Sequence, residues 1–368
     1  MKKILYLVTQ SDWGGAQKYV YDLATNLSQN NNIIVAGGEQ CENGELAQRL
    51  KEKNITYHPI SHLKRAILPW HDFLAFWQIV KLIKQEKPDI IHLNSTKISI
   101  LGSLAGQWCK APKIIFTAHG WVFSEELSWF KKTLYTILEK WTAKFKHQII
   151  CLSEFEKNNT IKNKIAKSEK ISVIYNGIKP IDFLSREQAR EKLNLNKDEL
   201  MIGIIANLYK TKGLEYLIES IKDLNLKLII IGGGPEKENL KSKILNLGLE
   251  NKIKLIGNIK NNASSYLKAF DIYVCSSIKE GMPYTILEAM QTGLPVVSTN
   301  VGAIPEVIEN NRTGFLVEPK NSEQLVVKIK YLIDNPNVAK KLGKNAKEKV
   351  KKFSLEKMIK KTEELYNN

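Results

Sequence analysis

Two glutamates eight positions apart, Glu280 and Glu288, are the residues of this sequence best suited to chemistry. Carboxylates can accept hydrogen bonds from the hydroxyl groups of a sugar, and charge-assisted bonds of this kind contribute about 1.5–3 kcal/mol each. The free backbone N–H groups of Met282, Tyr284 and Thr285 would cluster at a helix start between them, where a phosphate is favourably held. A nucleotide sugar, with phosphate between hydroxylated rings, fits this pattern. The alternative is a pair of solvated surface glutamates.

The local sequence predicts how these carboxylates are positioned. Residues 271–277 form an apolar run with polar ends, which is typical of a buried strand. Gly281 permits a tight turn, and Pro283 suits the first position of a helix. A Gly-Leu-Pro sequence then ends the helix after roughly ten residues. We therefore expect strand, turn, short helix and strand, with Glu280 in the turn and Glu288 on the helix.

This stretch resembles the signature of the retaining glycosyltransferases of family 4, which have the two-domain GT-B fold. Further matches follow in the family's order and cover nearly the whole chain: Gly14-Gly15, Thr117 to Gly120, Asn176-Gly177, Lys212-Gly213 and Gly232 to Glu236. The resemblance implies an α/β fold of two doubly wound, Rossmann-like domains whose parallel sheets face an interdomain cleft. It also implies that the product keeps the anomeric configuration of the donor.

The rest of the chain alternates strands with helices, which independently predicts parallel sheets with crossover helices. The expected strands are Lys3–Thr9, Asn32–Gly37, Ile90–Asn94, Ile114–Ala118, Gln148–Leu152, Met201–Ala206, Leu226–Ile231, Lys252–Ile256, Ile272–Cys275, Val296–Thr299 and Gly314–Val317. The expected helices of the first half are Ala16–Gln29, Gly44–Lys53, Phe73–Glu86, Ser99–Cys109 and Trp129–Phe145.

A linker near Asn176–Leu184, with its Asn-Gly and Lys-Pro pairs, marks the domain boundary. We expect an N-terminal, acceptor-binding domain at 1–180 and a C-terminal, nucleotide-sugar-binding domain at 181–350. By the resemblance, the last helix (351–368) crosses back to the N-terminal domain.

Ligands of open α/β sheets bind at the carboxyl ends of the strands, so the loops there carry the remaining candidates. Gly233 and Glu236 lie in a glycine turn that the resemblance places beside the nucleotide. Lys212 matches the family's diphosphate-binding lysine, whereas the family's arginine is replaced by the uncharged Asn207. This departure leaves open how the diphosphate is neutralised. A structural glycine turn and a solvated lysine are the alternatives.

In the first half, Gly14 and Gly15 would let the backbone approach the diphosphate, although a plain glycine turn would have the same sequence. His119 ends an expected strand and matches the family's His-Gly turn, so it is expected to contact the donor sugar; a lone histidine is more often structural. The predicted catalytic residues are Glu280, His119 and Lys212. The predicted donor-binding residues are Gly14, Gly15, Asn207, Lys212, Gly233, Glu236, Gly281, Met282, Pro283, Tyr284 and Glu288.

Neither a metal nor another cofactor is expected. The sequence has no Asp-x-Asp pair, with which glycosyltransferases of the other main architecture hold a divalent metal, and no Cys-x-x-Cys pair. No stretch supplies a complete G-x-G-x-x-G motif, so a nicotinamide cofactor is not indicated. Lys212, helix ends and backbone amides would instead stabilise the leaving group. No carboxylate suited to a double displacement is identified, so front-side attack is the working hypothesis.

The net charge of +17 raises the question of a nucleic-acid partner. Residues 1–184 carry 25 basic against 16 acidic residues, and residues 185–368 carry 30 against 22, so no basic arm stands out. No nucleic-acid motif accompanies the charge, and no such partner is expected. Anionic lipid headgroups would explain the basic stretches 131–170 and 340–361, as would a lysine-rich proteome.

No apolar run approaches the roughly 20 residues that span a bilayer, and the apolar part of the N-terminus is too short for a signal peptide. We expect a cytoplasmic protein, peripheral at the inner face of the plasma membrane. Leu134, Leu138, Trp141 and Phe145 follow helical spacing among lysines. They indicate either a helix that docks on a membrane or, the favoured interpretation, one that packs on the sheet. The tryptophan-rich segments 68–77 and 121–129 are candidates for an acceptor groove.

Together these features predict a metal-independent, retaining glycosyltransferase. It would move a hexose or N-acetylhexosamine from a UDP-linked nucleotide sugar to a glycan or polyprenyl-linked acceptor in cell-surface polysaccharide synthesis. The alternatives are a nucleotide-sugar epimerase of the same fold and a non-catalytic sugar-nucleotide binder.

Overall fold

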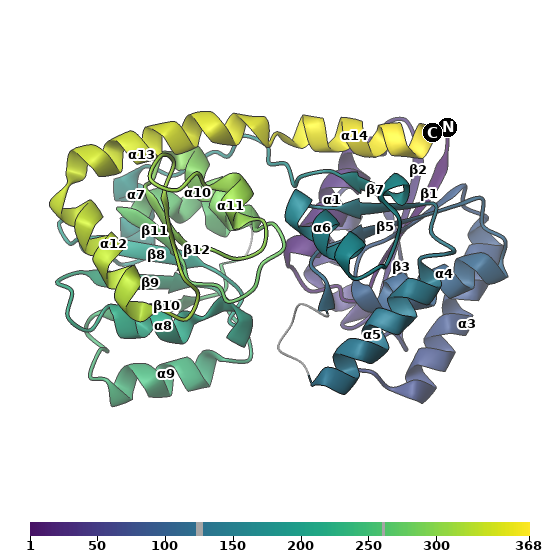
Figure 1. Ribbon diagram of the computed structural model, residues 1–368, viewed down its shortest axis with the longest axis horizontal. Helices are drawn as coiled ribbons and strands as arrows, with labels where there is room; N and C mark the ends of the chain where they lie inside the picture. Colours follow the sequence, from purple (N-terminus) through teal and green to yellow (C-terminus); the bar gives the residue numbers. More distant parts are fainter. Residues whose placement is uncertain (123–127, 260–261) are drawn as a thin grey trace. The chain divides into compact units, whose positions relative to one another are not determined.

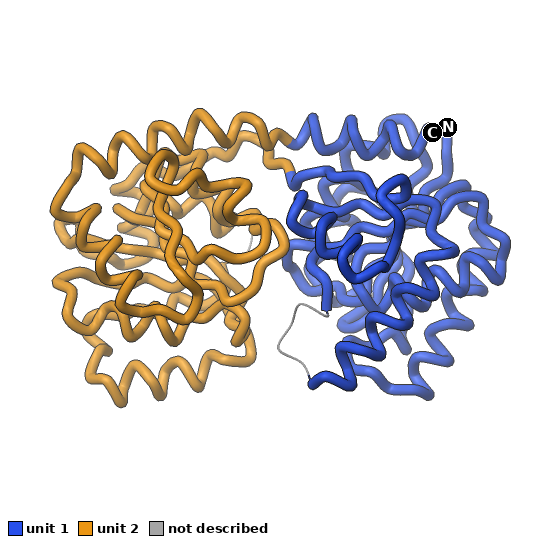
Figure 2. Tube along the Cα trace, in the orientation of Figure 1, with its two compact units in different colours: residues 1–176, 355–368 blue, residues 177–354 orange. Residues whose placement is uncertain are grey.

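The computed structural model describes residues 1–122, 128–259 and 262–368. The chain divides into two compact units (Figure 2). Unit 1 comprises residues 1–176 and 355–368, and unit 2 comprises residues 177–354. The sequence suggests domain boundaries at residues 180 and 350, and the two units divide after residues 176 and 354. Each unit is a parallel sheet with helices on both of its faces (Figure 1).

In its described residues, unit 1 holds a seven-stranded sheet in the order β3-β2-β1-β4-β5-β6-β7, with every pair parallel. The strands are β1 (Lys3–Val8), β2 (Asn32–Gly37), β3 (Thr56–Pro59), β4 (Ile90–Leu93), β5 (Lys113–Ala118), β6 (Gln148–Cys151) and β7 (Ile171–Val173). The helices are α1 (Gly15–Leu27), α2 (Glu45–Glu52), α3 (Pro69–Glu86), α4 (Thr96–Trp108), α5 (Trp129–Thr142), α6 (Glu154–Lys162) and α14 (Leu355–Asn367), with short 3₁₀ turns η1 (Cys41–Asn43) and η3 (Ser168–Lys170).

Unit 2 holds a sheet in the order β10-β9-β8-β11-β12-β13, again parallel throughout. The strands are β8 (Met201–Ile205), β9 (Lys227–Ile231), β10 (Ile253–Gly257), β11 (Ile272–Cys275), β12 (Val296–Thr299) and β13 (Phe315–Val317). The helices are α7 (Arg186–Lys192), α8 (Leu214–Ser220), α9 (Lys237–Asn246), α10 (Tyr284–Thr292), α11 (Ile304–Val307), α12 (Ser322–Asp334) and α13 (Pro336–Lys349). The 3₁₀ turns are η4 (Lys210–Lys212), η5 (Ala263–Ala269) and η6 (Val350–Lys352).

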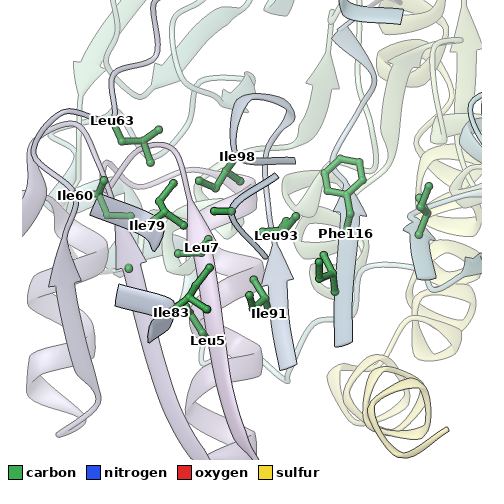
Figure 3. Close-up of a cluster of buried hydrophobic side chains, with 14 of the residues drawn as sticks. Leu5, Leu7, Ile60, Leu63, Ile79, Ile83, Ile91, Leu93, Ile98 and Phe116 are labelled. Atoms are coloured by element: carbon green, nitrogen blue, oxygen red, sulfur yellow. The ribbon is translucent and has the colours of Figure 1, made fainter. Parts of the chain in front are cut away.

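The strands are nearly continuous apolar runs because the core lies on both faces of each sheet. A parallel sheet is covered on both faces, so its central strands are mostly apolar on both faces. Figure 3 shows one such layer in unit 1, where Leu5, Leu7 and Leu93 of the sheet meet Ile79 and Ile83 of α3. In both units the strand order reverses in the middle of the sheet, between β1 and β4 and between β8 and β11. Loops diverge at such switch points and leave room for a ligand.

Three local expectations need correction. Pro283 is the N-cap of α10 and not its first helical residue, because its ψ of 123° is extended. Helix α1 begins at Gly15 and not at Ala16. The short strands β3 and β7 were not expected, since β3 reads Thr-Tyr-His-Pro and has no apolar run.

The favoured interpretation of the segment Trp129–Phe145, an apolar stripe packed on the sheet, is wrong. Leu134 and Trp141 are 39% and 48% exposed. The buried residues of α5 are Glu139 and Thr142, and Glu139 accepts a hydrogen bond from Ser99 of α4 at 2.9 Å. Helix α5 therefore contacts α4 through the hydrogen bond between Glu139 and Ser99. No helix within the described ranges is long and apolar enough to cross a membrane.

Candidate functional site

An ion pair between Lys212 and Glu280 lies at the switch point of unit 2. The Lys212 Nζ atom donates to Glu280 Oε1 at 2.6 Å, and Ser277 Oγ donates to the same oxygen at 2.6 Å. Lys212 ends the turn η4 after β8, and Glu280 follows β11, so the two neighbouring strands deliver the pair. Their side chains are only 24% and 10% exposed. The structure thus brings together two of the three predicted catalytic residues.

Hydrogen bonds hold the two loops in place. The Ile278 N–H donates to the Thr211 carbonyl at 2.8 Å, and Ser276 Oγ donates to the Lys212 carbonyl at 3.0 Å. Gly213 lies between them with φ +56°, and a Cβ there would come within 2.3 Å of the Ser276 carbonyl oxygen. This close approach requires glycine. The ion pair is therefore preorganised by its own backbone.

The charge state of the pair follows from its surroundings. Burial alone lowers the pKa of Lys212, but the charge and the hydrogen bond of Glu280 outweigh it, so the pKa of Lys212 is raised. Lys212 is therefore a cation at neutral pH. Burial, followed by the nearby charge of Glu280, raises the pKa of the Cys275 thiol, which favours its protonated form.

A third loop, between β12 and α11, supports Glu280 from behind. The Ala303 N–H donates to the Gly281 carbonyl at 3.0 Å, and Thr299 Oγ1 donates to the Ser277 carbonyl at 2.6 Å. Gly302 has φ +57°, and a Cβ there would lie 1.9 Å from the Glu280 carbonyl oxygen. Sequence analysis missed Gly302. The rule that loops after parallel strands carry the site would have found it, because Gly302 follows β12.

The second carboxylate, Glu288, has a different partner from Glu280. It lies within α10, is 6% exposed, and accepts a hydrogen bond from Ser264 Oγ at 2.6 Å. Met282 and Tyr284 at the start of α10 are 5% and 6% exposed, so their side chains face the protein. A contact of this helix start with a ligand would therefore use backbone N–H groups, as the sequence suggests.

The glycine turn after β9 lies beside the loop that contains Asn207. The Leu208 N–H donates to the Gly233 carbonyl at 2.9 Å, and the Glu236 N–H donates to the Leu208 carbonyl at 3.0 Å. Glu236 is the N-cap residue of α9, and Asn207 is exposed at the end of β8. A small cavity of about 210 Å³ adjoins the turn. Its lining comprises Tyr209, Lys210, Leu214, Glu215, Glu236 and Leu240.

In unit 1, His119 lies at the end of β5, beside the switch point between β1 and β4. Its Nε2 atom is 3.4 Å from Asn94 Oδ1, and its ring meets the ring of Tyr19 edge-on at 4.9 Å. Burial lowers the pKa of His119 to about 3, so the imidazole is neutral at pH 7 and can donate or accept one hydrogen bond. Gly14 is the N-cap of α1 and Gly15 is its first residue; the same helix carries Tyr19.

A buried hydrogen-bond network connects this region to the C-terminal helix. Tyr366 Oη of α14 lies 2.5 Å from His92 Nδ1 and 2.9 Å from Tyr6 Oη. His92 Nε2 is 2.7 Å from Thr117 Oγ1, which donates to Tyr19 Oη at 3.2 Å. Sequence analysis missed this network, because its members come from strands and helices far apart in the chain.

We expect acid to destabilise unit 1 through His92. This residue is fully buried, and burial, followed by the neighbouring His119, lowers its pKa from 6.5 to about 3. Between about pH 6.5 and pH 3, His92 binds a proton in the unfolded chain but not in the folded one. The free energy of unfolding therefore falls by up to about 1.4 kcal/mol for each unit by which the pH is lowered. The loss should be read from urea unfolding between about pH 7.5 and pH 5. All seven tryptophans lie in residues 1–141, so their fluorescence reports on unit 1.

The control for this expectation is His92→Gln, which keeps polar atoms in the network but does not titrate. Carboxylates also contribute to the pH dependence of the wild type, so the informative quantity is the difference in slope between the two proteins. An equal slope in both would show that His92 does not couple folding to pH.

Potential metal ligands do not gather in the part of the chain that the structure describes: no group of three or more His, Cys, Asp or Glu residues there could hold an ion. Lys212 and the partial positive charge at the helix N-terminus of α10 are groups of the described site that could attract an anion.

Comparison with known proteins gives concordant results for both units. Residues 13–180 match the description "Glycosyltransferase Family 4", and residues 185–349 match "Glycosyl transferases group 1". Among curated relatives, UDP-Gal:alpha-D-GlcNAc-diphosphoundecaprenol alpha-1,3-galactosyltransferase of Escherichia coli is 31% identical over 308 residues, or 80% of this chain and 79% of the relative. The capsular polysaccharide biosynthesis glycosyltransferase CapM of Staphylococcus aureus is 27% identical over 100% of this chain and 97% of its own.

Among solved structures, HepE of Anabaena in complex with UDP and glucose superposes over the full length of both chains, with a TM-score of 0.86 and 22% identity. This likeness confirms the expected fold of two Rossmann-like domains. Sequence and structure agree, and the chain belongs to the family 4 glycosyltransferases, enzymes with the GT-B fold.

Proposed function

We propose that this enzyme transfers a hexose or N-acetylhexosamine from a UDP-sugar to a glycan or polyprenyl-linked acceptor during synthesis of a cell-surface polysaccharide. The observation that carries the proposal is the preorganised Lys212–Glu280 pair at the switch point of unit 2. The relative that is 31% identical is named for UDP-Gal as donor and for a lipid-diphosphate-linked acceptor. CapM is named for capsular polysaccharide biosynthesis.

In this proposal, Lys212 changes partners when the donor binds. Its charge is balanced by Glu280 at 2.6 Å in the structure, and a diphosphate would attract the same cation. Glu280 would then accept hydrogen bonds from hydroxyl groups of the donor sugar. Backbone N–H groups at the start of α10 would add positive potential at the phosphate. This arrangement favours departure of the nucleotide, since fixed charges that meet developing charge are a large catalytic term.

The remaining donor contacts stay predictions. Gly233 and Glu236 would lie beside the nucleotide, because their turn is hydrogen-bonded to the Asn207 loop. Glu288 would need to exchange its bond with Ser264 for one with the donor. His119, a neutral imidazole, could hydrogen-bond a sugar hydroxyl. Gly14 and Gly15 are assigned to the diphosphate by resemblance.

We further propose that transfer retains the anomeric configuration by front-side attack and needs no metal. Lys212 and the start of α10 would supply the positive charge that a metal supplies elsewhere. We place the enzyme in the cytoplasm, peripheral at the inner face of the plasma membrane. All four cysteines are free thiols, which suits a reducing compartment.

A single assay tests the function. The full-length protein is incubated with UDP-Gal, UDP-Glc or UDP-GlcNAc and with polyprenyl-diphosphate-linked N-acetylglucosamine, with and without EDTA. We expect UDP release that depends on the acceptor and persists in EDTA. The anomeric configuration of the product, read by NMR, tests retention.

Other outcomes separate the alternatives. Isomerised sugar without an acceptor would identify an epimerase, and tight UDP binding without turnover would identify a binder. Activity that EDTA abolishes and a divalent cation restores would contradict the metal-independent mechanism while leaving the transferase assignment intact.

A further inference from the structure

Helix α5 exposes an unusual amount of apolar surface for a helix of an α/β unit. Trp129, Phe130, Leu134, Ile137 and Trp141 are between 39% and 79% exposed. A helix that covers a sheet normally turns such residues inward. Large exposed apolar patches on soluble proteins are usually interaction sites.

The charges on the outer side of α5 have a single sign. Lys131 and Lys140 are exposed, and Lys144 is exposed just after the helix. The one acidic residue of the helix, Glu139, is 1% exposed, and its charge is balanced by Lys146 Nζ at 2.7 Å. The charged groups that the helix exposes are therefore all positive, and bulky apolar groups lie beside them.

The adjoining helices α3 and α4 also expose aromatic side chains. Trp70, Phe73 and Trp77 of α3 and Trp108 of α4 are 41–69% exposed. Their rings touch one another, with centroids 5.8 Å apart for Trp70 and Phe73 and 5.7 Å apart for Trp77 and Trp108. Helix α4 packs against both α3 and α5 (Figure 1). We call these exposed aromatic, aliphatic and lysine side chains of α3, α4 and α5 the α3–α5 surface.

The position of this surface relates it to the ends of the strands. Each of these helices leads from the carboxyl end of one parallel strand to the amino end of the next, so its first residues lie beside the loops that follow the strands. Trp70 and Trp129 occupy such first turns. The β5–α5 connection also begins at His119. The exposed aromatic residues thus reach the edge of unit 1 where its candidate residues lie.

We propose that the α3–α5 surface docks on a membrane that contains anionic phospholipids. Tryptophan is favoured at the level of lipid headgroups because its ring is apolar and its N–H is polar. Lysines beside an anionic surface add about 1 kcal/mol each. The proposal complements the proposed function, since a polyprenyl-linked acceptor is presented at such a surface, but docking itself does not require transferase activity.

Charge complementarity favours a membrane over a second copy of the chain. In a two-fold symmetric dimer the same patch meets itself, so the lysines of one α5 would face those of the other. Helix α5 exposes no carboxylate that could balance them. Phospholipid phosphates supply the missing negative charge, and acyl chains accept the apolar groups.

Vesicle flotation of the full-length protein tests the proposal. We expect wild type to float with vesicles of phosphatidylcholine and phosphatidylglycerol, more weakly with phosphatidylcholine alone, and less at high salt. Phe130→Ser/Ile137→Ser should lower the partition coefficient at least about tenfold. Lys131→Glu/Lys140→Glu should abolish the preference for anionic vesicles. Brominated lipids should quench the fluorescence of wild type, because five of the seven tryptophans lie on the α3–α5 surface.

Matched controls lie in unit 2. Leu245 and Val327 are 63% and 60% exposed, so Leu245→Ser/Val327→Ser removes equally accessible apolar groups elsewhere. Lys330→Glu/Lys340→Glu makes the same charge change on exposed lysines of α12 and α13. Both controls should float like wild type. UDP binding by calorimetry should be equal in all five proteins, so a failure of donor binding is recognised separately from a failure of docking.

Three results would overturn the proposal. Wild type could fail to float with anionic vesicles, or the α5 variants could float as well as wild type. Alternatively, wild type could sediment as a dimer that Phe130→Ser/Ile137→Ser dissociates without any change in vesicle binding, which would assign the surface to a second copy of the chain.

Discussion

Replacing Glu280 by glutamine should lower the rate of sugar transfer by about 10²–10³-fold, the usual effect of removing one preorganised charge from a catalytic site. Glutamine has nearly the same size and can still accept hydrogen bonds from Lys212 and Ser277. It cannot balance the Lys212 cation, and it binds sugar hydroxyls without a charge. The rate should be measured as acceptor-dependent release of UDP, with kcat and KM determined separately.

The control is Glu250→Gln, the same change at an exposed position of unit 2, which should leave transfer unaltered. Lys212→Gln and the double variant complete the cycle. Because the two side chains act as one ion pair, the double variant should lose less activity than the two single losses combined. Wild-type turnover by Glu280→Gln, in a protein that still binds UDP, would remove Glu280 from the mechanism.

The fold could be predicted because its signal is repeated along the chain. Strands such as Asn32–Gly37 and Val296–Thr299 are short apolar runs between polar turns, and their bounds agree with the structure. A parallel sheet buries both faces of its central strands, so the pattern of each strand shows in its own residues. The edge strands β3 and β7 have no such pattern, because their residues, Thr56–Pro59 and Ile171–Val173, contain no run of apolar side chains.

The sequence predicts which residues of the candidate site lie close together where those residues follow neighbouring strands. Lys212 and Glu280 are 68 residues apart in sequence, yet each follows one of two adjacent strands, and the rule for strand ends brings them together. Their direct contact does not follow from that rule, since it depends on Gly213 and on the bonds between the two loops. The bond between Glu288 and Ser264 likewise depends on how η5 packs against α10.

The orientation of α5 could not be predicted, for a different reason. Helical spacing of Leu134, Leu138 and Trp141 shows that one side of the helix is apolar, but not which way that side faces. The orientation is decided by Glu139, whose buried carboxylate is held by Ser99 and Lys146. The Ser99 partner comes from α4, and a pattern within a single helix does not reveal such a contact.

Gly302→Ala should damage both stability and activity, although residue 302 needs no contact with the substrate. The added Cβ would lie 1.9 Å from the Glu280 carbonyl oxygen, at a φ of +57° that alanine adopts poorly. The expected loss of stability is about 2–5 kcal/mol, from backbone strain and from overpacking. The Glu280 backbone must also move, and a displacement of about 1 Å can cost about 10²-fold in rate.

Gly248→Ala separates these two causes. Gly248 has φ +65°, but a Cβ there would meet nothing within 4 Å, so the variant suffers strain without the clash. We expect a loss of about 1–2 kcal/mol and unchanged transfer. Unfolding of both variants should be followed by circular dichroism in urea, because unit 2 has no tryptophan. Equal rates of sugar transfer by Gly302→Ala and Gly248→Ala would show that the loop after β12 does not hold Glu280 in place. The hydrogen bonds made by Thr211 and Ser277 would then be sufficient to position it.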